Sequence, residues 1–374
     1  MAAALRATRT AAHAVWPLPA LLVLVVVSTE IAWASGGSVT KGVVVVALIN
    51  LILVIGLYTF VGNSGVFSFG SIGFASIGAY TAGLLVIPVA QKAILQPDLP
   101  HFIANAHFGS VAATLMGGVV GAVVGFAFAI PLMRLNGIAA GLATFAMLVI
   151  IKTVANSWTQ VTNGAAGLSG LPITTSKNAA MIWALIAIAV AFVFQSSALG
   201  LRLRGSREDD VAARSVGVDV VMERRVAWVL HAFIMGVGGA LYGQYLGSFN
   251  SSFFYIALTF TTLAMLVVGG LKSLTGAVVG SLAISFVAEV LHRIEQGADF
   301  GIFHVPARPG LREVGLAIIM LTILVLRPRG LTNGRELPWP RIPRRRALEV
   351  RGSTAAEGGG AAAESPANVP QQPS

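Results

Sequence analysis

Long apolar runs, separated by short polar breaks, fill most of this sequence and leave few charges to cover a water-facing surface. Only 11% of the 374 residues are charged, whereas a soluble globular domain carries about 25%. The main body of such a chain is therefore not a soluble enzyme. Since backbone polar groups must be paired inside lipid, runs of this length are expected to be membrane-crossing helices. The predicted fold class is an all-α polytopic membrane protein.

Ten runs are candidate spans, because about 20 apolar residues cross roughly 30 Å of hydrocarbon. They are 17–34, 43–61, 66–89, 109–132, 137–155, 179–195, 226–247, 256–271, 274–291 and 313–326. The expected architecture is a helical bundle of about ten transmembrane segments, with eight as the lower bound. Three parts follow: an N-terminal segment 1–16, a transmembrane domain 17–331 and a tail 332–374.

The positions of the basic residues orient these spans. With the N-terminus in the cytoplasm and all ten segments crossing, 18 of the 25 Lys and Arg residues fall on the cytoplasmic side. The positive-inside rule therefore favours both termini in the cytoplasm. For the first segment a cleavable signal peptide is the alternative, with Ala32-Trp33-Ala34 as its cleavage site.

The loop 196–225, which this map places in the cytoplasm, concentrates charges of both signs. Residues 200–225 hold six basic and five acidic residues. Ser206 and Asp209 have capping-box spacing, and Gly217 fits a helix stop. We predict a short amphipathic helix, about 207–216, that docks a soluble partner; a solvated linker with local ion pairs is the alternative. The predicted coupling residues are Arg207, Glu208, Asp209, Asp210, Ala212, Ala213 and Gly217.

A segment rich in Gly and Ser, 62–83, is the candidate translocation element. Its small residues predict a broken or closely packed helix, and irregular backbone inside a membrane survives where it lines a cavity or is buried in protein. The alternative is that these residues only allow helices to pack closely. The pathway candidates are Asn63, Ser64, Ser68, Ser71, Gly73, Gly78 and Tyr80.

Several motifs, in this order along the chain, carry a family resemblance. They are GSIGFASIGAYT at 70–81, SALGLRLR at 197–204, VAARSVG at 211–217, GGALY at 238–242, GGLKSLTG at 269–276 and LRPRGL at 326–331. Together they resemble the branched-chain amino acid importer permeases, in the LivM-type branch. VAARSVG is similar to the EAA-x-x-x-G coupling loop, with Val211 in the Glu position. Lys272 and Ala277 depart from the usual Gly and Pro.

The resemblance implies a permease subunit of an ATP-driven importer that carries branched-chain or related hydrophobic amino acids by alternating access. The same machine for urea, short amides or another small solute is one alternative, and an ion-coupled secondary carrier is another. The implied location is a bacterial cytoplasmic (inner) membrane, with the C-terminus in the cytoplasm.

The sequence holds no G-x-x-x-x-G-K-[ST] motif, so we expect no enzyme activity and no bound cofactor in this chain. The resemblance implies that two ATP-binding cassette subunits use ATP and Mg. The other implied partners are a homologous LivH-type permease, an extracytoplasmic solute-binding protein and membrane lipids, with no nucleic acid. The tail is basic around 341–346 and is expected to be disordered over 352–374.

Overall fold

The computed structural model describes residues 16–35, 37–295, 310–327, 330–334 and 336, all within one compact unit, Met1–Trp339. Pro340–Ser374 form a second unit, which lies outside the described residues. The predictions for residues 1–15 and for the basic and disordered tail therefore also concern residues outside the described part.

A helix occupies each of the ten predicted spans, so the all-α fold is confirmed for the described residues. These helices are α2 (Pro17–Ser35), α3 (Ser38–Ser64), α4 (Ser71–Val86), α7 (Ser110–Leu132), α8 (Gly137–Ser157), α10 (Lys177–Ser196), α13 (Val220–Leu246), α14 (Ile256–Gly269), α15 (Leu274–Glu295) and α16 (Leu311–Leu326). Short elements connect them: α5 (Val89–Leu95), α6 (His101–Ala104), α9 (Thr159–Thr162), η1 (Gly164–Ala166), α11 (Ala198–Glu208) and α12 (Asp210–Ser215).

Seven of these helices are long and apolar enough to cross a membrane on their own among the described residues. An eighth span results if α4 and α5, which meet at 114°, count as one broken span. The helices α14 and α16 are apolar but shorter than a full span. The Gly- and Ser-rich segment 62–83 is broken, one of the two forms predicted for it, because α3 ends at Ser64 with Gly65 in the left-handed region and α4 begins only at Ser71.

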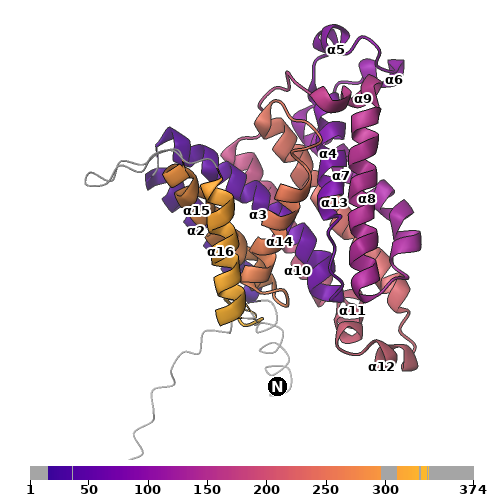
Figure 1. Ribbon diagram of the computed structural model, residues 1–374, viewed down its shortest axis with the longest axis vertical. Coiled ribbons are helices and arrows are strands. Elements are labelled where there is room, and N and C mark those ends of the chain that lie inside the picture. The colour runs from indigo at the N-terminus through magenta and orange to yellow at the C-terminus, as the bar shows by residue number, and fades with distance from the viewer. Residues whose placement is uncertain (1–15, 36, 296–309, 328–329, 335, 337–374) are drawn as a thin grey trace, which may run out of the picture. The chain divides into compact units, whose positions relative to one another are not determined.

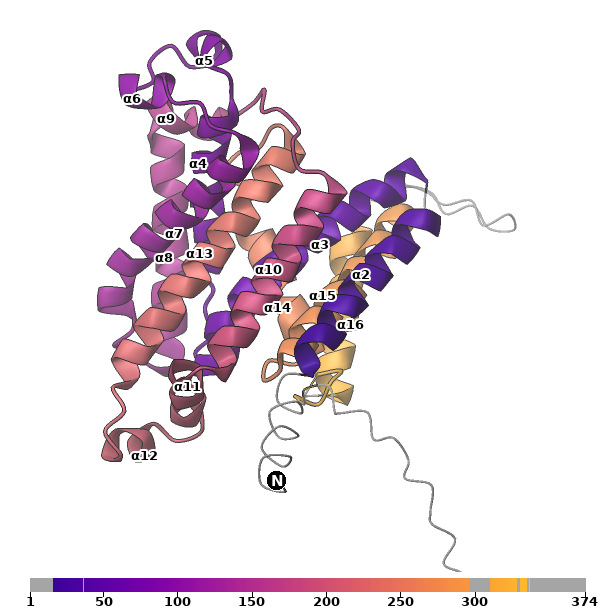
Figure 2. The same cartoon turned by 180° about the vertical axis from the view of Figure 1, so that it is seen from behind.

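The connections alternate between two ends of the bundle (Figures 1 and 2). At one end, here called the α5 end, Lys177 at the start of α10 pairs with Glu30 near the end of α2 at 2.7 Å. At the opposite end, the α12 end, the Leu331 backbone N–H donates to the Val268 carbonyl at 2.8 Å. This alternation agrees with the grouping of loops in the ten-span map.

The helices α3 and α13 are buried along most of their length. On α13, Trp228 packs edge-on against Phe60 of α3 and Phe74 of α4, with ring centroids 4.8 and 5.4 Å apart. Further along, a Cβ added to Gly78 would lie 2.0 Å from the Gly236 carbonyl oxygen. Only glycine fits there, since the α4 and α13 backbones are in contact.

The chain after α16 folds back onto the α12 end of the bundle. The Glu336 carboxylate accepts hydrogen bonds from the backbone N–H groups of Leu274 and Thr275, at 2.8 and 3.1 Å. These are the first residues of α15, so a residue remote in sequence satisfies two of the N–H groups that a helix start leaves unpaired. The packed part of the chain thus continues past 331.

Candidate functional site: the α12 end of the bundle

The helix α12 is a separate short helix with its own cap. Asp209 Oδ1 accepts from the backbone N–H groups of Val211 and Ala212 at 3.0 and 2.9 Å. Ser206 is not the cap that its spacing predicts, because α11 continues through it to Glu208. The Ser206 hydroxyl instead donates to the Leu203 carbonyl at 2.8 Å within α11. The predicted helix 207–216 is accordingly divided at Asp209.

Gly217 ends α12 in the manner predicted. Its φ is 86°, in the left-handed region that favours glycine. The Val218 N–H donates to the Ala213 carbonyl at 3.1 Å, and the Gly217 N–H donates to the Arg214 carbonyl at 3.0 Å. These two bonds are the Schellman pattern, which satisfies the last carbonyls of the helix. The helix is therefore fixed at both ends although it is only six residues long.

The helix α12 exposes Val211 in its first turn and is followed by an exposed Val216, while ion pairs join it to the bundle. Val211 and Val216 are 78% and 79% exposed, whereas Ala213 is buried. Asp210 pairs with Arg214 one turn along at 3.0 Å and with Arg224 of α13 at 3.9 Å. Arg224 also donates to the Asn136 side chain in the turn between α7 and α8. A displacement of α12 would therefore reach α13 and the α7–α8 turn directly.

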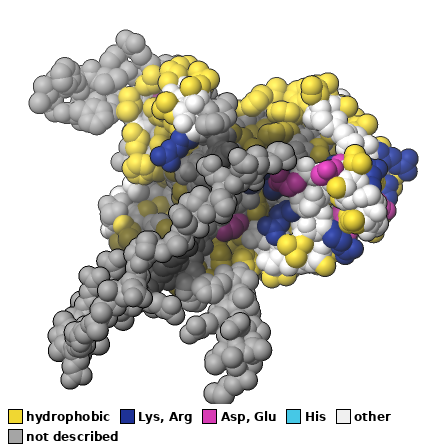
Figure 3. Space-filling view, turned by 90° about the horizontal axis from the view of Figure 1, so that it is seen from below, with side chains coloured by type: hydrophobic (Ala, Val, Ile, Leu, Met, Phe, Trp, Pro, Cys, Tyr) yellow, Lys and Arg dark blue, Asp and Glu magenta, His cyan; other side chains and the backbone are white. Residues whose placement is uncertain are grey.

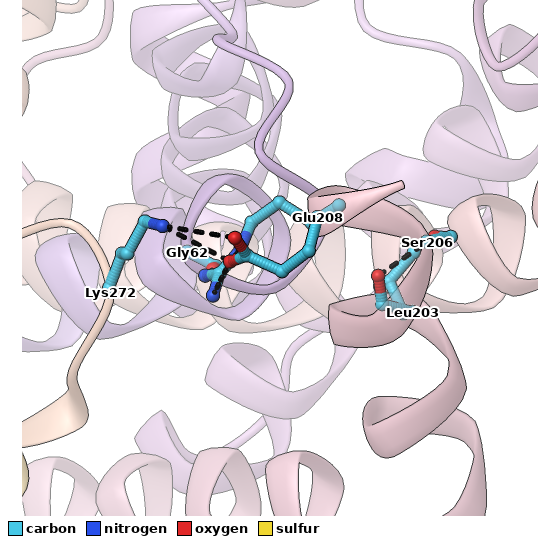
Figure 4. A network of polar contacts seen from close by, with 6 residues as sticks. Gly62, Leu203, Ser206, Glu208 and Lys272 are labelled. Carbon is cyan, nitrogen blue, oxygen red and sulfur yellow. Dashed lines mark hydrogen bonds and ion pairs between the residues drawn. The ribbon is translucent and has the colours of Figure 1, made fainter. Parts of the chain in front are cut away.

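A second polar network joins α11 to two other parts of the bundle (Figure 4). The Arg207 guanidinium donates to the Gly62 carbonyl near the end of α3. It also pairs with Glu208 at 2.9 Å, and Glu208 pairs with Lys272, between α14 and α15, at 3.1 Å. Hydrogen bonds from Lys272 and Arg207 hold the pKa of the Glu208 carboxyl below its ordinary value. The network thus connects the loop 196–225 with the break before α4.

The charged side chains gather on one part of the α12 end. Seen from below, Lys and Arg side chains are interspersed with Asp and Glu, and apolar side chains lie beside them (Figure 3). The exposed members of the ion pairs include Arg202, Arg214, Lys272 and Glu208, each with more than half of its side chain accessible. A surface of mixed charge around two exposed valines suits a protein partner better than a lipid face.

The predicted pathway residues are all buried, at the end of α3, in the break that follows it, or along α4: Asn63, Ser64, Ser68, Ser71, Gly73, Gly78 and Tyr80. The hydroxyls in the break are paired locally, with Ser71 donating to Ser68 at 3.0 Å and Ser64 donating to the Phe60 carbonyl at 2.7 Å. Gly78 lies in the α4–α13 contact. Their role in translocation stays a prediction.

One polar position in α3 was not among the predicted site residues. Asn50 is the only amide side chain in the run 43–61 and lines two cavities, of about 420 and 320 Å³, together with Tyr242 of α13. A lone amide within an apolar run is the sequence signal that could have indicated it. In the described part of the chain, no three His, Cys, Asp or Glu side chains are grouped as metal ligands.

Comparison with known proteins places these features in context. Residues 39–325 match the family described as "Branched-chain amino acid transport system / permease component". The chain is 25% identical to the high-affinity branched-chain amino acid transport system permease protein LivM of Escherichia coli (strain K12), over 84% of this chain and 74% of that protein. The LivM protein of Salmonella typhimurium has the same identity and coverage. The "Probable branched-chain amino acid transport permease protein LivH" of Methanocaldococcus jannaschii is 26% identical over 43% of this chain and 48% of its own length.

Proposed function

The chain belongs to the branched-chain amino acid transport permease family, and from this premise we propose that it is the LivM-type permease subunit of an ATP-driven importer in a bacterial inner membrane. Its solutes are branched-chain or related hydrophobic amino acids. The observation that carries the proposal is α12: a capped and stopped helix at one end of the bundle, with two valines exposed and ion pairs to the helix behind it.

The helix α12 is the element that docks into an ATPase subunit. Val211 in the helix and Val216 directly after it are exposed apolar side chains, and the ends of the helix are fixed by Asp209 and Gly217. A helix held in this way moves as a rigid body, which is how displacement of a docked element passes into a bundle. Asp210 and Arg224 carry the displacement to α13, and Arg207 carries it to the end of α3.

The remaining parts of the importer follow from this assignment. The α12 end faces the cytoplasm, in agreement with the placement of basic residues, and the C-terminus lies on that side. Two separate ATP-binding cassette subunits hydrolyse ATP with Mg, so this chain binds no cofactor and is not itself an enzyme. A homologous LivH-type permease pairs with it inside the lipid bilayer, and a solute-binding protein docks at the α5 end.

The test changes only the two exposed valines, Val211 and Val216. The importer is reconstituted in proteoliposomes with its ATPase subunits and binding protein, and ATP-dependent L-leucine uptake is measured. We expect Val211→Asp with Val216→Asp to abolish uptake and the co-purification of the ATPase subunits. The matched control, Val211→Thr with Val216→Thr, keeps the side-chain shape without a charge and retains both.

Two outcomes would contradict the proposal. Uptake by the wild type that persists without ATP or without the ATPase subunits indicates a secondary carrier instead. Full uptake and ATPase binding in the double Asp variant, inserted at the wild-type level, indicates that the ATPase contacts another surface. Uptake of urea or a short amide in place of L-leucine would keep the importer and change its solute class.

A further inference from the structure

Two neighbouring cavities open between α3, α13, α14 and α15, and α16 also lines the larger one; none of the predicted pathway residues lines either cavity. The larger, about 420 Å³, is lined mostly by apolar side chains, including Leu258 and Phe260 of α14 and Ile284 of α15. The smaller, about 320 Å³, includes Ser285 and Glu289 of α15. Asn50 and Tyr242 line both, so the cavities meet at this pair. Both volumes lie in the range of sites that hold small molecules.

Two polar atoms that border these cavities, Asn50 Oδ1 and Ser285 Oγ, are buried without a hydrogen-bond partner among the described residues. Asn50 and Ser285 are each only 7% exposed. In the part of the chain that the structure describes, neither the Asn50 side-chain oxygen nor the Ser285 hydroxyl has a hydrogen-bond partner. Leaving a buried polar atom unpaired is costly, and native proteins rarely do so without a ligand or water at the site. The side-chain oxygen of Asn50 is therefore available to accept a hydrogen bond from a molecule that enters the cavities.

The lining has the amphipathic character of the proposed solutes. An asparagine amide both donates and accepts, so it can pair with the carboxylate or the ammonium group of a zwitterion. Glu289, which lies near the end of α15 that points to the α5 end, places an acidic group on the smaller cavity. The larger cavity presents Leu258, Phe260 and Ile284 to an apolar side chain.

We propose that the two cavities joined at Asn50 and Tyr242 are the solute-contacting wall that this chain contributes to the translocation pathway. Asn50 and Ser285 contact the polar head of the solute, and the α14–α15 side contacts its apolar side chain. This inference rests on the proposed function and adds to it the face of the chain along which the solute moves.

The chain contains no cysteine, so single cysteines introduced into it can be labelled selectively. Ser285 has a matched neighbour one turn earlier on α15: Ser281 is also buried with an unpaired hydroxyl, but it is not among the residues that line either cavity. In the assembled importer, a small water-soluble thiol reagent is expected to label Ser285→Cys about tenfold faster than Ser281→Cys, because only the first borders a cavity that admits solvent. Labelling is followed by the mass of this chain.

Protection of the cysteine by solute then distinguishes a translocation pathway from a cavity that the solute does not enter. Under turnover with the binding protein, ATP and L-leucine, we expect the labelling of Ser285→Cys to slow, while glycerol at the same concentration leaves it unchanged. Equal labelling of the two cysteines, or labelling of Ser285→Cys that L-leucine never slows in an importer that transports L-leucine, overturns the inference.

A second variant tests the amide itself. Asn50→Leu keeps the approximate size and removes the polar contact, and uptake at subsaturating L-leucine is expected to fall about tenfold or more, as for other sites built to hydrogen-bond a ligand. Ser281→Ala, the control, retains uptake. If Asn50→Leu takes up L-leucine at the wild-type rate, the inference is refuted but the proposed function stands. If the wild type shows no ATP-driven uptake of L-leucine, the proposed function is refuted. In that case the cysteine labelling without solute still reports whether the cavities are accessible.

Discussion

Replacing Arg207 with alanine should detach the loop 196–225 from the break before α4. The guanidinium donates to the carbonyl of Gly62, which is buried near the C-terminal end of α3, and its aliphatic part lies against Gly65. Hydrogen bonds from a charged donor contribute about 1.5–3 kcal/mol. The side chain is 15% exposed, so solvent screens this bond only in part. We expect Arg207→Ala to lower the free energy of unfolding by about 2 kcal/mol.

The same loss should appear in function. About 2 kcal/mol corresponds to roughly a 30-fold change in an equilibrium between attached and detached arrangements of the loop. In the reconstituted importer we therefore expect fewer L-leucine molecules transported per ATP hydrolysed. Arg207→Lys, which keeps the charge and most of the aliphatic stem, should be affected less than Arg207→Ala.

The comparison variant is Lys272→Ala, which breaks the other arm of the network. Lys272 and Glu208 are both more than half exposed, and exposed ion pairs contribute little to stability. The test compares the two variants in denaturant unfolding and in the number of L-leucine molecules transported per ATP hydrolysed. If Arg207→Ala unfolds at the same denaturant concentration as Lys272→Ala and couples equally well, the bond to Gly62 does not anchor the loop.

Three further changes have defined outcomes. Asp209→Ala removes the cap of α12 and should destabilise that helix by about 1 kcal/mol, seen as faster amide exchange at its first residues; unchanged exchange would contradict the cap. Gly78→Val forces a Cβ against the Gly236 carbonyl oxygen and should lower the free energy of unfolding by about 1–3 kcal/mol or more, whereas wild-type stability would show that the α4–α13 contact is loose. Because the pKa of Glu208 is lowered by Lys272 and Arg207, the advantage of the wild type over Glu208→Gln is complete above pH 4.5 and disappears as the pH falls through the lower pKa of the folded state. The denaturant midpoints of the wild type and Glu208→Gln, measured across this pH range, give the difference in stability. A difference that grows as the pH falls would contradict a lowered pKa of Glu208.

The sequence predicts the helices well because, within an apolar run, each span must form the hydrogen bonds of its backbone N–H and C=O groups internally. It also predicts where α12 stops, since Gly217 acts through local backbone geometry. The start of α12 could not be predicted from spacing alone. Ser206 and Asp209 both have the chemistry of a cap, and α11, begun by the Ser197 cap, continues past the first of them.

The features that local patterns miss are those made by distant segments. Asn50 and Tyr242 come from α3 and α13, and they become a candidate site only because those helices pack side by side along the two cavities. In the same way, nothing around Arg207 in the sequence indicates that its partner is the carbonyl of Gly62. Such contacts depend on the tertiary arrangement of the bundle.

The return of the chain at Glu336 has a consequence for the order in which the protein is made. The start of α15 is completed by a carboxylate that follows it by about sixty residues and comes after α16. Until residue 336 has been made, the first N–H groups of α15 have water and the Ser273 hydroxyl, which accepts from the Gly276 N–H, as their partners. A chain that stops before Glu336 lacks this carboxylate, so the residues after α16 contribute to the stability of a helix made about sixty residues earlier.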